Sequence, residues 1–128
     1  KVDVISELGD NKLLLDYKTG KVESAELNFK DYTQFYTGTK KKSKALQLLT
    51  YAWVYYMENA ETEHISPCIY SFKNSKAGFM YLKYNNKIIS KKEVLDIFPK
   101  VVDALVSKLM NKKTALVHDE DSLYCEYC

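Results

Sequence analysis

The sequence predicts an α/β domain in which helices flank a small mixed β-sheet. Segments with strand-type alternation are interspersed with segments whose apolar residues recur at helical spacing, and this mixture is typical of that class. The 128 residues are 46% hydrophobic and 28% charged, which fits a single globular domain over residues 1–128. No apolar run approaches the roughly 20 residues of a membrane span, so no membrane partner is expected. The net charge of +2 does not by itself indicate a nucleic-acid binder.

A β-hairpin is expected at the start of the chain. Residues 1–8 and 11–18 have strand character, and Gly9-Asp10 between them suits a two-residue type II′ turn. With that turn, the numbers of facing residues sum to nineteen, so Ile5 faces Leu14 in an apolar pair.

A helix is expected next, after a polar and aromatic-rich connection over residues 21–42. It covers residues 43–59, and Ser43 is a candidate cap. Its apolar face at helical spacing comprises Leu46, Leu49, Trp53 and Tyr56 or Met57.

The second half of the chain reads as two strands followed by helix. The strands cover residues 65–73 and 79–84, with a loop at 74–78 and a turn at Asn85-Asn86. Ser90 and Glu93 form a capping box that opens a helix at about residue 91. Pro99 predicts a kink or break, with a second helical stretch over residues 101–110.

The hairpin register also places Asp3 opposite Asp16, and this pair needs an explanation because opposed like charges are destabilising. Either the register differs, or the strand edges lie in water, or a cation sits between the two carboxylates. Mg²⁺ is typically held by one or two carboxylates together with substrate phosphate oxygens. Lys18 shares the face of Asp16, because strand side chains alternate. The three side chains would then suit phosphodiester cleavage, in which a metal activates water and Lys18 orients it or stabilises negative charge.

Four segments in order strengthen this interpretation. They are Lys-Val-Asp-Val at residues 1–4, Leu-Leu-Asp-Tyr-Lys-Thr-Gly at 14–20, Gln-x-x-x-Tyr at 47–51, and Tyr-Cys-Glu-Tyr-Cys at 124–128. Together they resemble the PD-(D/E)XK nuclease superfamily, and most closely its RecB/AddB-like branch, where similar segments occur in this order.

The resemblance implies a restriction-endonuclease-like core that lacks its N-terminal helix. It implies an exonuclease or endonuclease that hydrolyses DNA phosphodiester bonds with Mg²⁺ or Mn²⁺. The metal ligands would be Asp3, Asp16 and the backbone carbonyl of Tyr17. The catalytic residues would be Asp3, Asp16, Lys18, Gln47 and Tyr51, the last two projecting from a helix toward the active site or the DNA.

The resemblance also implies a larger parent protein. Both ends of the chain look cut, so we expect a piece of a cytoplasmic helicase–nuclease or related DNA-repair and recombination protein, with a helicase domain or subunit as partner. Cys125 and Cys128 would belong to a 4Fe–4S cluster of that parent. Cys68 is expected to be a buried apolar residue instead. The family's upstream metal-ligating His is missing, since His64 reads as a surface residue and His118 as a tail residue.

Positive charge is densest at Lys40, Lys41, Lys42 and Lys44. A solvated loop is the more common reading of such a run, but in a nuclease these lysines would contact DNA phosphates. Tyr32, Phe35 and Tyr36 lie just before it and would suit base stacking in a single-strand channel.

Two other functions stay open. The chain could be a catalytically incomplete module of the same fold that holds DNA or forms a complex without cleavage. A small zinc-binding protein built on Cys125 and Cys128 would need two further ligands.

Overall fold

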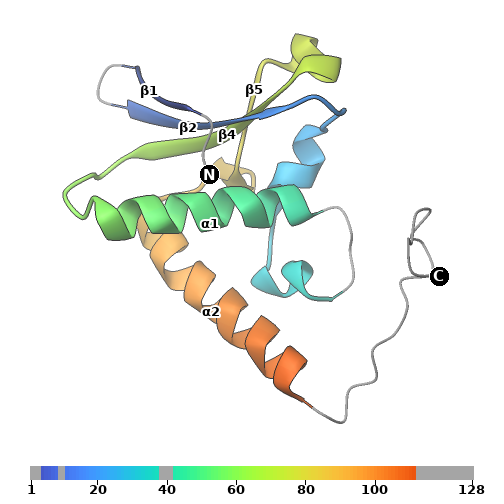
Figure 1. Ribbon diagram of the computed structural model, residues 1–128, viewed down its shortest axis with the longest axis vertical. Helices are drawn as coiled ribbons and strands as arrows, with labels where there is room; N and C mark the ends of the chain where they lie inside the picture. Colours follow the sequence, from blue (N-terminus) through green and yellow to red (C-terminus); the bar gives the residue numbers. More distant parts are fainter. Residues whose placement is uncertain (1–3, 9–10, 38–41, 112–128) are drawn as a thin grey trace.

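The computed structural model describes residues 4–8, 11–37 and 42–111, and it has the predicted α/β class (Figure 1). A four-stranded sheet has the order β1-β2-β4-β5. Its strands are β1 (Val4–Leu8), β2 (Asn11–Lys18), β4 (Ile65–Ser71) and β5 (Phe79–Tyr81). The sheet is mixed, because β2 and β4 are parallel whereas the other neighbours are antiparallel. Helix α1 (Ser43–Glu58) lies along one face of this sheet, and α2 (Lys91–Met110) packs against α1.

The predicted hairpin register is confirmed. Ile5 faces Leu14 and Leu8 faces Asn11, as the two-residue loop requires. Leu14 is fully buried, but Ile5 is 53% exposed because β1 is an edge strand. The turn at Gly9-Asp10 lies outside the described residues.

Helix α1 matches its predicted range to within one residue, but its start and its buried face differ from expectation. Lys42, not Ser43, is the N-terminal flanking residue, and it makes no side-chain capping bond. The predicted apolar stripe is only partly right, because Leu46 and Trp53 are half-buried and Met57 is exposed. The small side chains of Ala45 and Ala52 allow a different face of the helix to pack toward the sheet. The buried residues are Ala45, Leu48, Leu49, Ala52 and Tyr56.

The predicted strand at 79–84 is divided between two sheets. After β5, the chain crosses at the buried Leu82, whose N–H donates to the carbonyl of Pro67 at 2.8 Å and whose carbonyl accepts from Ile89 at 3.2 Å. The next strand joins a small second sheet of β3 (Asn28–Phe29), β6 (Lys83–Tyr84) and β7 (Lys87–Ile88). The predicted turn between β6 and β7 is confirmed, with φ of 51° and 66° at Asn85 and Asn86.

The segment before β5 also differs from expectation. Strand β4 ends at Ser71, and the predicted end of that strand and most of the predicted loop form a 3-10 helix, η4 (Phe72–Ala77). Two further 3-10 helices, η1 (Ser24–Leu27) and η2 (Tyr32–Phe35), lie in the connection between β2 and α1.

Helix α2 confirms the capping box and corrects the expected break. Ser90 accepts a hydrogen bond from the Glu93 N–H, and the Glu93 carboxylate accepts from the Ser90 N–H at 2.8 Å. The helix then continues through Pro99 to Met110 as one element, although proline removes one helical hydrogen bond. Apolar residues on both sides of the proline, Ile97 and Val101, are buried in the core, and this packing offsets the lost bond.

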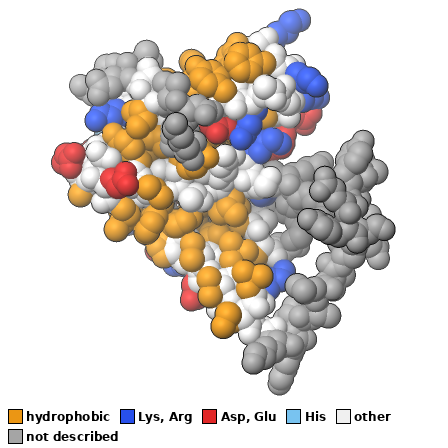
Figure 2. All heavy atoms as spheres, viewed as in Figure 1, with side chains coloured by type: hydrophobic (Ala, Val, Ile, Leu, Met, Phe, Trp, Pro, Cys, Tyr) orange, Lys and Arg blue, Asp and Glu red, His pale blue; other side chains and the backbone are white. Residues whose placement is uncertain are grey.

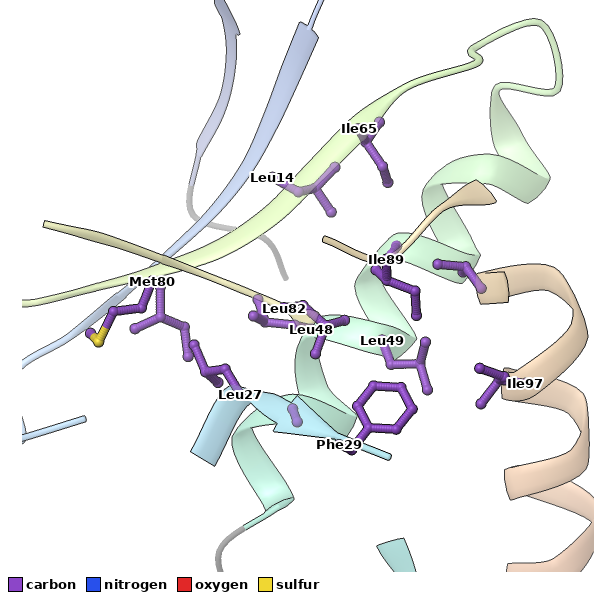
Figure 3. Close-up of a cluster of buried hydrophobic side chains, with 14 of the residues drawn as sticks. Leu14, Leu27, Phe29, Leu48, Leu49, Ile65, Met80, Leu82, Ile89 and Ile97 are labelled. Atoms are coloured by element: carbon purple, nitrogen blue, oxygen red, sulfur yellow. The ribbon is translucent and has the colours of Figure 1, made fainter. Parts of the chain in front are cut away.

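The main core lies between the four-stranded sheet, the two helices and the small sheet (Figure 3). Leu14, Leu48, Leu49 and Phe29 are at its centre, each at most 1% exposed. A smaller cluster of Leu13, Leu15 and Cys68 lies on the other face of the sheet. In the described part of the chain, no helix has the length and apolar character needed to cross a bilayer.

Candidate active site

Strand β2 carries two of the predicted catalytic residues, Asp16 and Lys18, on the face that α1 covers. Leu14 belongs to the main core beneath α1, and alternation places Asp16 and Lys18 on the same face. Asp16 is 4% exposed, whereas Lys18 is half-buried. Tyr17 between them points to the opposite face and is 41% exposed.

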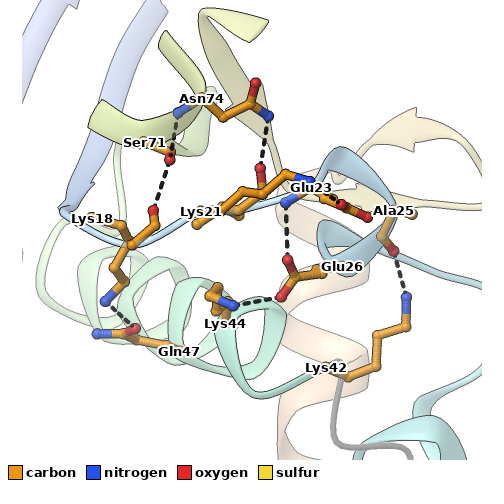
Figure 4. A network of polar contacts seen from close by, with 12 residues as sticks. Lys18, Lys21, Glu23, Ala25, Glu26, Lys42, Lys44, Gln47, Ser71 and Asn74 are labelled. Atoms are coloured by element: carbon orange, nitrogen blue, oxygen red, sulfur yellow. Dashed lines mark hydrogen bonds and ion pairs between the residues drawn. The ribbon is translucent and has the colours of Figure 1, made fainter.

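Four of the predicted site residues form one continuous polar chain between β2 and α1. The Lys18 Nζ atom lies 2.9 Å from Asp16 Oδ2. The same ammonium donates a hydrogen bond to Gln47 Oε1 at 2.9 Å (Figure 4). Gln47 Nε2 in turn donates to the Tyr51 hydroxyl at 2.7 Å, as the spacing of four on one helix allows. The structure therefore brings Asp16, Lys18, Gln47 and Tyr51 together from segments that lie far apart in the sequence.

Asp16 is held in an environment that suits a cation. Its Oδ2 atom is buried and accepts no hydrogen bond, because the contact with Lys18 is an ion pair without hydrogen-bond angles. Burying a carboxylate costs free energy unless a counter-charge and hydrogen bonds compensate, and here Lys18 supplies only part of that compensation. A hard divalent cation, which prefers carboxylate oxygens, fits this donor atom.

Several other residues of the predicted metal and cluster sites lie outside the described part of the chain. Asp3 is one of them, and the described register of the hairpin begins at the Val4–Leu15 pair. Within residues 4–8, 11–37 and 42–111, no three His, Cys, Asp or Glu side chains gather as a metal site. Cys125, Cys128 and His118 also lie outside the described residues. Cys68 is buried as predicted, and burial raises the pKa of its thiol to about 11. His64 is exposed, also as predicted.

The end of β2 is fixed by two residues that the sequence analysis did not single out. The Ser71 hydroxyl donates to the carbonyl of Gly20 at 2.8 Å, and Asn74 Nδ2 donates to the carbonyl of Val22 at 2.9 Å (Figure 4). Asn74 also donates its backbone N–H to the Ser71 hydroxyl at 3.2 Å. A serine at a strand end with asparagine three residues later is a capping signal that would have drawn attention to this pair.

The two described lysines of the basic run make contacts within the chain. Lys42 Nζ donates to the carbonyls of Ala25, at 2.7 Å, and Asn28. Lys44 Nζ pairs with the Glu26 carboxylate at 2.5 Å. Burial lowers the pKa of Lys42. These ammonium groups thus hold the start of α1 against η1, and Lys40 and Lys41 lie outside the described residues.

The aromatic residues before that run are held against the core. Phe35 packs on Phe29 with ring centroids 4.8 Å apart, and the rings of Tyr32 and Tyr36 are 6.3 Å apart. Tyr32 and Phe35 both pack against the main core. Their predicted role in base stacking stays a prediction.

No protein-family model, curated protein or solved structure matches this chain.

Proposed function

We propose that this chain is a metal-dependent DNA nuclease domain of the PD-(D/E)XK superfamily, with a restriction-endonuclease-like core. Its parent would be a RecB/AddB-like helicase–nuclease or a related DNA-repair protein. One observation carries the proposal: a buried carboxylate without a hydrogen-bond donor lies beside a lysine that Gln47 holds. The fold supports the proposal at the level of class, since the hairpin leads through α1 into a strand parallel to β2.

The residues of the polar chain divide into two roles. Asp16 would hold the metal, together with Asp3 and the Tyr17 carbonyl, and a bound divalent ion would supply Lewis acidity and a water of lowered pKa. Lys18 would carry positive charge toward the scissile phosphate and its developing negative charge. Gln47 and Tyr51 are positioning residues, because Gln47 fixes the Lys18 ammonium and Tyr51 fixes Gln47.

The test is Mg²⁺- or Mn²⁺-dependent degradation of linear single-stranded and double-stranded DNA. Asp16→Asn and Lys18→Met should each lower the rate by about a thousandfold, because each removes a charge that the transition state needs. Lys21→Met is the matched control, since Lys21 makes a surface ion pair with Glu23 at 2.8 Å and both side chains are exposed. Full activity of Asp16→Asn would overturn the assignment.

The alternative, a DNA-holding or complex-forming module without cleavage, is favoured by one observation. The Lys18 ammonium already neutralises Asp16 at 2.9 Å, so this carboxylate has a counter-charge before any metal binds. Calorimetric titration with Mn²⁺ separates the two functions. If the chain is a nuclease, the wild type should bind Mn²⁺ at up to millimolar concentration, and the Asp16→Asn variant should not bind it. A module without cleavage should show no binding in either protein.

A further inference from the structure

The sheet face opposite α1 carries four aromatic rings in mutual contact. This aromatic surface consists of Tyr17, Tyr70, Phe72 and Phe79. Phe72 stacks on Tyr17 with centroids 5.7 Å apart, and Tyr70 meets Phe72 and Phe79 edge-on at 5.6 and 5.8 Å. Three of the rings come from strands β2, β4 and β5 of the sheet, and the fourth comes from η4.

Three of these rings are open to solvent. Tyr17 is 41%, Phe72 59% and Phe79 44% exposed. Single exposed apolar residues need no explanation, but contiguous exposed apolar side chains usually mark a binding surface. At the top of Figure 2, where Figure 1 draws η4, hydrophobic side chains gather together with lysine side chains beside them.

The charged residues of the segment that carries three of the four rings have one sign. Lys73 and Lys76 lie between the two phenylalanines and are exposed, and neither pairs with a carboxylate in the described part of the chain. Residues 65–92 as a whole contain six lysines and no aspartate or glutamate. A ligand of this surface must therefore combine flat apolar groups with negative charge, and unpaired nucleotides have both.

The aromatic surface is fixed relative to the candidate active site. The bonds from Ser71 and Asn74 tie η4 to the chain immediately after Lys18. Gly78, with φ of 63°, allows the tight reversal from η4 into β5 that presents Phe79 beside Tyr70. Binding to these rings would thus hold a strand at the end of β2.

We propose that the aromatic surface binds single-stranded nucleic acid, with bases stacked on Phe72, Tyr17 and Phe79 and phosphates near Lys73 and Lys76. The inference deepens the proposed function, on which it rests for the choice of DNA as ligand. An uncharged apolar patch would suit a protein partner equally well, but the two unpaired lysines favour an anionic ligand.

The experiment measures binding of a fluorescein-labelled twelve-residue oligothymidylate to the chain by anisotropy in EDTA, where no cleavage occurs. Phe72→Ala should weaken binding about tenfold, and Phe72→Trp should restore it, because each stacked base contributes through a ring of any aromatic type. Met57→Ala is the matched control, since Met57 on α1 is also 59% exposed. It should bind like the wild type. A matching abasic oligomer should bind weakly to the wild type and be insensitive to Phe72→Ala.

A second pair of variants tests the phosphate contacts. Lys73→Gln with Lys76→Gln should lower the slope of log affinity against log salt by about 1.4, whereas the exposed Lys87→Gln alone should lower it by less than about 0.3. Wild-type affinity in Phe72→Ala, or no binding of the oligomer by the wild type, would overturn the inference and leave a protein partner as the occupant. Cleavage is measured separately with Mg²⁺. Cleavage without binding of the oligomer in EDTA would refute the aromatic surface alone, and binding without cleavage would refute the nuclease alone.

Discussion

The two faces of β2 carry side chains of opposite character, polar and buried on one face, aromatic and exposed on the other. Toward α1, Asp16 is buried, its charge is matched by Lys18, and Gln47 accepts a hydrogen bond from that lysine. On the other face, Tyr17 is 41% exposed and stacks on Phe72. The alternation of a strand thus separates a polar, enclosed site from an aromatic, open surface by one residue.

The difference lies in what covers each face. Helix α1 shields the polar chain from water, so an unmet charge there is expensive and each polar contact is strong. No α-helix lies over the aromatic rings in the described part of the chain, so their removal should affect ligands more than stability. Variants on the two faces should therefore separate folding from binding.

The largest expected effect on stability is on the polar face. Lys18→Met should lower the free energy of unfolding by about 3 kcal/mol, because Asp16 would stay buried with no counter-charge. Adding Asp16→Leu should restore most of that loss, since the buried charge is then gone. Urea denaturation of both variants measures the two values.

Lys21→Met is again the control for this comparison. The ion pair of Lys21 with Glu23 also joins residues two apart in the sequence, but the two side chains are 66% and 62% exposed, so its loss should leave the free energy of unfolding almost unchanged. An equal effect of the two lysine substitutions would show that α1 does not shield the site.

A smaller effect is expected from Cys68, which lies beneath the aromatic surface. Burial raises the pKa of its thiol to about 11 from the ordinary value of 9.0, so the folded protein keeps this proton up to a higher pH than the unfolded chain does. The stabilising difference is fully present below pH 9 and is lost as the pH rises toward 11. The loss should be about 2 kcal/mol by that point.

The measurement compares the pH dependence of unfolding with that of Cys68→Val, in a background of Cys125→Ser and Cys128→Ser. The valine variant should lack this part of the alkaline loss. Parallel curves for the two proteins between pH 9 and 11 would mean that the thiol is open to solvent and that the smaller core cluster is not closed.

Local patterns predicted the placement of the four described residues of the polar chain, because short-range geometry sets it. A two-residue turn and strand alternation are enough to place Asp16 and Lys18 on one face, and helix spacing joins Gln47 to Tyr51. The failure at residues 79–84 depends on contacts that a local pattern does not contain. The strand at 79–84 divides because Leu82 bonds to Pro67 and Ile89, which no local pattern shows.

Contacts that form only in the folded chain also explain two other differences from expectation. Helix α2 passes through Pro99 because the residues on either side are held in the core. Lys42, expected in a basic loop, reaches the carbonyls of Ala25 in η1 and Asn28 in β3 only once the chain is folded. The aromatic surface leaves one trace in the sequence, which is the absence of acidic residues over residues 65–92.

The smallest expected effect tests whether the polar chain acts as a unit. Tyr51→Phe removes the hydroxyl that accepts from Gln47 and should cost about 1 kcal/mol of stability. Tyr55→Phe is the control, because the hydroxyl of the half-buried Tyr55 bonds to no residue that the structure describes. If Tyr51 positions Lys18 through Gln47, its variant should also slow DNA cleavage several-fold while the affinity for the oligothymidylate stays unchanged. Loss of affinity with an unchanged cleavage rate would instead place Tyr51 at the DNA, and the two faces of β2 would then share one ligand.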